Sequence, residues 1–224
     1  MPRLDVWLVE TGRFRSRQTA KRAIRDGLIT VNGRLAKPST QLNGTESIII
    51  SGASDLLMGY DKLSHLDSLL GGNVVKSGDM VLDLGSSAGG FLEYILEKGA
   101  IAKGIEISER FKDGLLQLAS THPNVSIVIG DAFKIEPLTL FNESELDLLL
   151  VDVTTDPEGT AALIAKYSEL LKHGGRLIAA FKSRLTPSIA TVLTDRVSAL
   201  GYTDVSAITL DDSRQEFHVA GVRL

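Results

Sequence analysis

The sequence predicts an α/β protein with a doubly wound parallel sheet, preceded by a small α+β unit. From residue 58 onward, apolar runs of strand length alternate with helical stretches, the order that builds a parallel sheet through right-handed crossovers. The last two strand-like runs are separated only by residues 211–215, a segment too short for a crossover helix. We therefore expect these two strands to form an antiparallel hairpin at one edge of the sheet.

The first 52 residues show a different pattern. The period of the apolar residues predicts a helix over 3–10 and a second helix that Ser16 caps and Gly27 ends. Residues 29–31 and 34–35 flank an Asn-Gly pair that is typical of a tight hairpin turn. A further strand is predicted over 47–50. Because so short a unit buries little surface by itself, we expect it to pack against the larger unit.

In the larger unit, the apolar patterns predict an opening helix over 62–70. Parallel strands are then expected at residues 80–84, 102–107, 125–129, 147–152 and 176–181. Helices are expected between them at 89–98, 108–118 and 158–172, and after them at 187–200. The terminal hairpin should comprise residues 204–210 and 216–223. We expect residues 1–52 and 58–224 to be separate domains, joined by a linker at 53–57.

Charge differs sharply between these two parts. Residues 1–52 carry nine basic and four acidic side chains, whereas the remainder carries 15 basic and 24 acidic ones. A basic piece joined to an acidic piece indicates that the first binds a polyanion. The chain has no cysteine, which excludes disulfides and thiolate metal sites, and no metal is expected. Without a signal-like start or a long apolar run, we expect a cytoplasmic protein with no membrane partner.

The turn after the first parallel strand is the most informative segment. An apolar strand ends in Asp83, turns through Gly85 and opens a helix at Gly90, so small residues and free helix N–H groups can approach a ligand. A dinucleotide fingerprint would need glycine where Ser87 stands. Gly-x-Ser-x-Gly also matches a hydrolase nucleophile elbow, which would need Asp152 with His173 or His218 as partners.

A third interpretation of the turn is Asp-x-Gly-x-x-x-Gly-Gly, supported by two further acids. Glu106 lies near the end of the next strand, where it could bind ribose hydroxyls, and Asp131 follows the third strand. This set resembles motif I of class I S-adenosylmethionine-dependent methyltransferases, which have a Rossmann-like fold. The resemblance implies S-adenosylmethionine as cofactor, bound by Asp83, Gly85, Ser86, Ser87, Gly89, Gly90, Phe91, Glu106, Asp131 and Ala132.

Four charged residues stand at the ends of predicted helices and strands. Lys62 opens the first helix, Asp152 and Lys182 end the fourth and fifth strands, and Glu216 begins the last strand. A neighbouring ammonium should lower a lysine's pKa and make it a base. The order Lys, Asp, Lys, Glu resembles the catalytic tetrad of FtsJ-like ribose 2′-O-methyltransferases, and that resemblance implies these four residues as catalytic, with Lys182 as the base.

The basic front piece resembles the small RNA-binding domain first known from ribosomal protein S4, on residues that include Arg3-Leu4-Asp5, Ser16-Arg17 and Val31-Asn32-Gly33. Together the two parts resemble the hemolysin A family of ribosomal RNA 2′-O-methyltransferases. Segments 57–61, 153–157 and 183–186 depart from that family's usual pattern. The predicted phosphate contacts are Arg3, Arg13, Arg15, Arg17, Lys21, Arg22 and Arg25.

The resemblance implies methyl transfer from S-adenosylmethionine to a ribose 2′-hydroxyl of RNA, most naturally ribosomal RNA. Two other functions stay open at this point. One is a non-catalytic RNA-binding or ribosome-assembly protein that retains the fold, which the three departing segments allow. The other is a membrane-damaging protein, as the family's name suggests, against which the absence of an amphipathic membrane helix argues.

Overall fold

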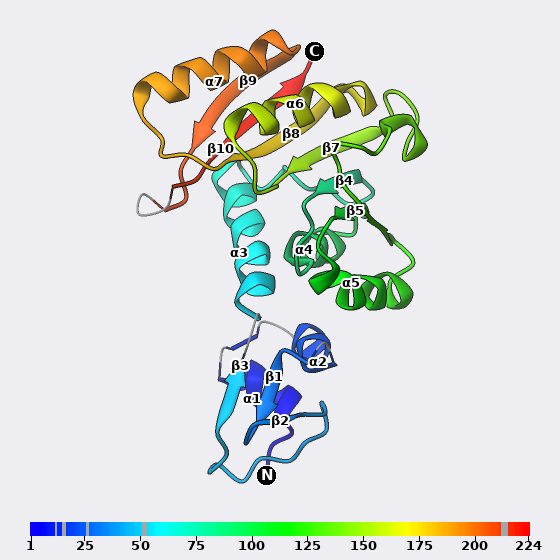
Figure 1. Ribbon diagram of the computed structural model, residues 1–224, viewed down its shortest axis with the longest axis vertical. Helices are drawn as coiled ribbons and strands as arrows, with labels where there is room; N and C mark the ends of the chain where they lie inside the picture. The colour runs from blue at the N-terminus through cyan, green and yellow to red at the C-terminus, as the bar shows by residue number, and fades with distance from the viewer. Residues whose placement is uncertain (12, 15–16, 26, 51–52, 212–214) are drawn as a thin grey trace.

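The computed structural model describes residues 1–11, 13–14, 17–25, 27–50, 53–211 and 215–224. Figure 1 shows a small N-terminal unit and a larger unit, with the long helix α3 (Ala53–Leu69) running between them. The N-terminal unit contains α1 (Leu4–Glu10), α2 (Arg17–Arg25), β1 (Ile29–Val31), β2 (Arg34–Leu35) and β3 (Ile48–Ile50).

The N-terminal unit has its own small core. The three strands form an antiparallel sheet in the order β2-β1-β3. Asn32 and Gly33, between β1 and β2, have φ of 52° and 74°, which confirms the predicted left-handed turn. The two helices and the sheet bury a cluster of apolar side chains that comprises Leu4, Leu8, Phe14, Ala20, Ala23, Ile24, Ile29 and Leu42.

The larger unit is built on a seven-stranded sheet in the order β6-β5-β4-β7-β8-β10-β9. Strands β4 to β8 are parallel, and β10 is antiparallel to both β8 and β9. The predicted hairpin is therefore confirmed at one edge, with β9 outermost. The strand bounds are β4 (Met80–Leu84), β5 (Ile101–Glu106), β6 (Val125–Ile129), β7 (Leu146–Val151), β8 (Leu171–Phe181), β9 (Tyr202–Ile208) and β10 (Phe217–Arg223).

Helices cover both faces of this sheet, as expected for a doubly wound fold. The remaining helices are α4 (Gly90–Glu97), α5 (Glu109–Thr121), α6 (Pro157–Tyr167) and α7 (Pro187–Ala199), with short 3₁₀ turns at Pro137–Thr139 and Ser168–Leu170. One core cluster joins the sheet to α6 and α7, and the other joins it to α3, α4 and α5. Along β4 the side chains alternate, since Leu82 and Leu84 face the first cluster and Val81 faces the second.

Two predicted boundaries differ from the structure. Residues 53–57, expected to be a linker, are the first turns of α3, whereas residues 51–52 lie outside the described chain. The predicted helix over 158–172 ends at Tyr167, and β8 begins at Leu171. The register between β7 and β8 shifts between Leu146 and Leu148, so residues 173–175, which lie between the predicted helix and the predicted strand, form an irregularity within β8. Within the described residues, no helix is both long enough and apolar enough to cross a membrane.

Candidate active site

The turn after β4, residues 85–90, is fixed by the strands on either side. The backbone N–H groups of Gly85 and Ser86 both donate to the Ile105 carbonyl of β5, at 2.9 and 3.0 Å. On the other side the Asp152 N–H donates to the Leu84 carbonyl. Gly85 has φ of 91°, and a Cβ there would collide with the Asp152 carbonyl. The positive φ and the close carbonyl both require glycine at this position. Without a side chain on Gly85, the end of β7 can pack directly against the turn.

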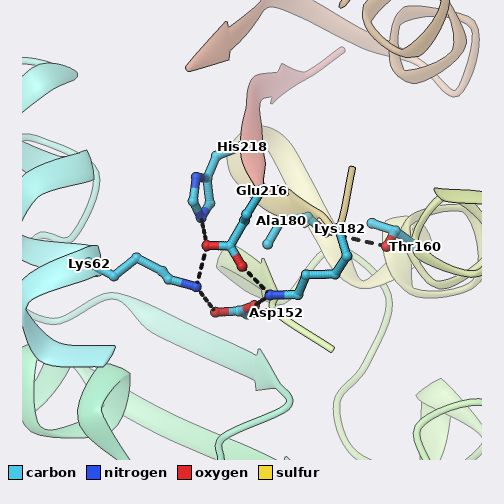
Figure 2. Close-up of polar contacts among 7 residues, drawn as sticks. All are labelled: Lys62, Asp152, Thr160, Ala180, Lys182, Glu216 and His218. Atoms are coloured by element: carbon cyan, nitrogen blue, oxygen red, sulfur yellow. Dashed lines mark hydrogen bonds and ion pairs between the residues drawn. The ribbon is translucent and has the colours of Figure 1, made fainter. Parts of the chain in front are cut away.

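Beside this turn, four charged side chains close into a ring in which cations and anions alternate (Figure 2). Lys62 Nζ lies 2.8 Å from Asp152 Oδ2 and 2.7 Å from Glu216 Oε1. Lys182 Nζ lies 2.5 Å from Asp152 Oδ1 and also contacts Glu216 Oε2. We call Lys62, Asp152, Lys182 and Glu216 the charged ring. All four predicted residues are thus brought together, from positions up to 154 apart in sequence numbering (62 to 216).

The fold explains why these four side chains meet. Asp152 and Lys182 follow the neighbouring parallel strands β7 and β8, whose carboxyl ends share one edge. In the antiparallel pair, Phe217 of β10 lies opposite Phe181 of β8, so Glu216 arrives beside Lys182. The Phe181 and Phe217 rings stack with their centroids 5.5 Å apart. Helix α3 supplies Lys62 from the other side.

The ring holds its members in their charged forms. Burial alone would raise the pKa of Asp152, but the Lys62 and Lys182 ammonium groups lower it to about 2. The pKa of Glu216 is likewise lowered by its hydrogen bonds to both lysines, against the effect of burial. Burial would lower the pKa of Lys182, yet Asp152 and Glu216 raise it. The expectation that a neighbouring ammonium lowers the pKa of Lys182 is therefore wrong for the protein without ligands. The two carboxylates that contact Lys182 have the larger effect.

Two cavities border the turn. One of about 250 Å³ lies between the turn and the charged ring. It is lined by five of the predicted cofactor residues that follow Asp83, namely Gly85, Ser86, Ser87, Gly90 and Phe91. The second, of about 400 Å³, continues past Glu106, Asp131 and Ala132. Gly85, Ser87, Asp152 and Thr154 line both cavities, so the two form one path along the carboxyl edge of the sheet.

The acids along this path have partners of different kinds. Glu106 accepts backbone hydrogen bonds from Ser87 and Ser108, each at 2.7 Å, so it fixes the two turns while one lone pair of each oxygen stays available. Asp131 accepts from the Phe133 N–H at 3.0 Å. Asp83 is fully buried, and neither of its carboxylate oxygens has a hydrogen-bond partner among the described residues. Burial raises the pKa of Asp83 to about 7, and the charges of Asp152 and Glu106 add to that rise.

A family model for FtsJ-like methyltransferases matches residues 58–219, and a model for the S4 domain matches residues 2–48. The chain belongs to the FtsJ-like methyltransferase family. The predicted architecture, an S4 domain followed by an FtsJ-like domain, is confirmed. The exact domain limits and the linker between them stay predictions.

Curated relatives resemble parts of this FtsJ-like chain. The fibrillarin-like rRNA/tRNA 2′-O-methyltransferase of Haloquadratum walsbyi is 29% identical over 107 residues, which are 48% of this chain and 49% of the relative. The 16S/23S rRNA (cytidine-2′-O)-methyltransferase TlyA of Mycobacterium tuberculosis is 34% identical over 102 residues, 44% of this chain and 37% of the relative. The chain thus spans about half or less of the relatives it matches.

Solved structures agree with the fold. Fibrillarin of Aeropyrum pernix, determined with natively bound S-adenosylmethionine, has a TM-score of 0.59 at 24% identity and covers 81% of this chain and 80% of its own. A Streptococcus thermophilus protein described as a candidate hemolysin has a TM-score of 0.56 at 20% identity, and covers 99% of this chain and 88% of its own. These likenesses confirm the predicted Rossmann-like methyltransferase fold.

The path along the sheet edge fits the cofactor of a methyltransferase. S-adenosylmethionine carries two positive groups, ribose hydroxyls and a flat base. The free lone pairs of Glu106 suit hydroxyls, and apolar side chains flank the far end, whereas the predicted cofactor residue Asp83 is fully buried and lines neither cavity. Ile107 and Phe133 line the larger cavity while 65% and 45% exposed. Sequence reasoning missed these two residues, although a large apolar residue one or two positions after each acid was the available signal.

Two predicted site residues have a different place in the structure, and a third lies outside the described residues. Gly89 lines neither cavity; it is the N-cap residue of α4 and lies against the Arg22 guanidinium. Arg22, predicted to contact phosphate, is itself buried, with an exposed fraction of 6%. Its ionic partner is Glu93 of α4, so the prediction for Arg22 is wrong. Arg15 lies outside the described residues.

The other predicted RNA-binding residues stay at the surface. Arg3, Arg17 and Lys21 surround the buried Asp5 carboxylate, and together Arg3 and Arg17 hold the pKa of Asp5 below its ordinary value against the effect of burial. Arg13 lies over the Trp7 ring, and Arg25 is exposed. Arg17, Lys21 and Arg25 also line a groove of about 510 Å³ between α2 and the end of α5.

The hydrolase interpretation finds no support in the geometry. His173 lies near the amino end of β8, away from the site, and His218 faces Glu216 instead of Ser87 (Figure 2). Sequence reasoning considered His218 only as a possible partner in a hydrolase site. This histidine is 2% exposed, its Nε2 lies 3.6 Å from Glu216 Oε1, and neither ring nitrogen has a hydrogen-bond partner among the described residues. Burial lowers its pKa to about 4, helped by the Lys62 charge.

This burial predicts an acid-sensitive fold. The unfolded chain protonates this imidazole below about pH 6.5, whereas the folded chain keeps His218 neutral down to about pH 4. Acid therefore favours the unfolded state, and the loss attributable to His218 between pH 7 and pH 5 should be about 2 kcal/mol. Urea unfolding of the wild type and of His218→Phe at both pH values measures it, and the variant should lose less stability by that amount. His173→Phe is the matched control at an exposed histidine. Equal losses in the wild type and His218→Phe would contradict the assignment.

Proposed function

We propose that the chain transfers a methyl group from S-adenosylmethionine to a ribose 2′-hydroxyl of RNA. The observation that carries this proposal is the charged ring, which borders the same cavity as the turn after β4. The ring offers ammonium donors and carboxylate acceptors within one hydrogen-bond length of each other. A hydroxyl group needs both, since its oxygen accepts while its proton is donated.

The residues that would hold the cofactor are those along the path described above. Gly85, Ser86, Ser87, Gly90 and Phe91 would bind the amino-acid part, and Glu106, Asp131 and Ala132 would bind the adenosine part. When bound, S-adenosylmethionine supplies a methyl group on a positively charged sulfur, which is already a strong electrophile. The protein therefore has to align the acceptor oxygen and take its proton.

The charged ring is suited to both tasks. Lys62 and Lys182 can donate to the acceptor oxygen and fix its position. The proton then passes to the ring, where we assign Lys182 as the group that accepts it. Since the pKa of Lys182 is raised in the chain alone, that lysine must lose its own proton before it can accept another. The four groups touch, so their protonation belongs to the ring as a whole.

RNA is the acceptor that the N-terminal domain supports, since an S4 domain model matches residues 2–48. The exposed cations on α2 can contact phosphates without reading sequence. Two of the relatives described above are named as rRNA 2′-O-methyltransferases, which makes ribosomal RNA the substrate to try first. A protein that works on ribosomal RNA in this way would be cytoplasmic, and we include that location in the proposal.

Replacing Lys182 tests the chemistry. Lys182→Ala should lower the rate of methyl transfer by on the order of 10²–10⁴ at saturating cofactor and RNA, because a proton acceptor at the reacting atom contributes that much. The measurement is transfer of a labelled methyl group from S-adenosylmethionine to ribosomal RNA, naked or in subunits. Lys172→Ala, at the other end of β8, is the control and should keep the wild-type rate. Near-wild-type transfer by Lys182→Ala would refute the assignment. Cofactor binding by the wild type without transfer to any RNA would instead favour a non-catalytic RNA-binding protein.

The salt dependence of RNA binding tests the role of α2. Each phosphate contact contributes about 0.7–0.9 to the slope of log affinity against log salt concentration, so neutralising Lys21 and Arg25 together should reduce the slope by roughly 1.5. Binding of the Lys21→Gln, Arg25→Gln double variant to ribosomal RNA over a series of salt concentrations gives the slope. A double variant of Lys76→Gln and Lys112→Gln, two cations of the larger unit, should leave it unchanged. A slope unaffected by loss of Lys21 and Arg25 would remove α2 from the RNA-binding surface.

A further inference from the structure

Arg22 differs from every other cation that α2 presents in the described chain. Lys21 and Arg25 are at least partly exposed, as expected for groups that meet RNA. The Arg22 side chain is 7% exposed and points out of the N-terminal domain into the methyltransferase domain. Burying an arginine removes the hydration of its charge, which is unfavourable unless hydrogen-bonding or ionic partners compensate for it. Its partners therefore show what it does.

Those partners belong to the turn that borders the proposed cofactor site. Arg22 Nη2 donates to the Ala88 carbonyl at 2.8 Å, and Nη1 donates to Glu93 Oε1 at 3.0 Å. Ala88 lies within the turn, and Glu93 lies in the first turn of α4. The planar guanidinium thus spans two acceptors, as arginine can and a point charge cannot.

The contact with Ala88 fixes a peptide unit of the turn. The Ala88 carbonyl and the Gly89 N–H belong to one planar peptide. That N–H donates to the Ser86 carbonyl at 2.7 Å. Arg22 therefore holds one side of the peptide while Ser86 holds the other. Ser86 itself lines the cavity between the turn and the charged ring, so the geometry of the cavity wall depends on this peptide.

Gly89 shows how close the approach is. It adopts φ of 87°, and a Cβ at this position would lie 2.8 Å from Arg22 Nη2. The guanidinium is therefore packed directly on the backbone of the turn. This explains why Gly89 matters to the turn although it lines neither cavity.

We propose that Arg22 is a positioning residue that holds the cofactor turn from the N-terminal domain, so that affinity for S-adenosylmethionine depends on the docked S4 domain. The inference rests on the proposed function, because it takes S-adenosylmethionine as the ligand of the turn. It assigns the S4 domain a second task besides RNA binding. The two tasks fall on adjacent parts of one helix, since Arg22 borders the same groove as Lys21 and Arg25: the exposed cations serve RNA, and the buried Arg22 serves the turn.

Calorimetric titration of the full chain with S-adenosylmethionine tests the proposal. Arg22→Ala should weaken binding by about tenfold, within the usual range of coupling between sites. Arg34→Ala, at an exposed arginine of β2 in the same domain, is the matched control and should bind the cofactor within twofold of the wild type. Arg22→Lys keeps the charge but cannot span both acceptors, so its affinity should fall between those of the wild type and Arg22→Ala.

In transfer assays, Arg22→Ala should raise KM for the cofactor and leave kcat at saturation within a few-fold of the wild-type value. A general loss of structure would not change KM and kcat so differently.

Thermal unfolding shows whether each variant is folded. If Arg22→Ala is not folded, Arg22→Lys decides, with a several-fold loss of affinity expected. The proposal would be overturned if a folded Arg22→Ala, or Arg22→Lys where Arg22→Ala does not fold, binds the cofactor within twofold of the wild type. Failure of the wild type to bind S-adenosylmethionine would instead refute the proposed function, so the two failures are distinguishable.

Discussion

The alternation of charge in the ring of Lys62, Asp152, Lys182 and Glu216 is the constraint on which the rest of the site depends. Two carboxylates buried side by side would repel each other and become protonated, and two buried ammonium groups would lose their charge. Placed alternately, each charge stabilises its neighbours, and the pKa shifts of Asp152, Lys182 and Glu216 all favour the ionised form. The fold has to bring four separate elements to one point to satisfy this condition.

Several features of the fold follow from that requirement. The parallel neighbours β7 and β8 place Asp152 and Lys182 at one edge, and the antiparallel return of β10 adds Glu216 beside them. Asp152 has a second task through its backbone, because its carbonyl packs against Gly85 of the cofactor turn. The group that orients the lysines is therefore in rigid contact with the loop beside which the cofactor is proposed to bind. Arg22 holds the same loop from the far side.

Local patterns in the sequence were enough to predict much of the fold and of the candidate site. The strand-end acids, the glycine turn, the four charged residues and the Asn-Gly hairpin each depend on a few adjacent residues, and the structure brings the four charged residues together as expected. What sequence reasoning missed depends on tertiary contacts. Nothing in the run of cations on α2 distinguishes Arg22, since its burial comes from Ala88 and Glu93 in another domain. The raised pKa of Lys182 and the burial of His218 likewise reflect neighbours that are distant in sequence.

The nature of the methylated product tests the central claim most directly. Ribosomal RNA treated with the chain and labelled S-adenosylmethionine can be digested to nucleosides and separated by chromatography and mass spectrometry. If the charged ring holds a ribose hydroxyl, the label will be in a 2′-O-methylnucleoside, and it will be retained after the base is removed. Label on a base, with none on ribose, would contradict the account, because it would mean that the ring does not present a 2′-oxygen to the methyl group.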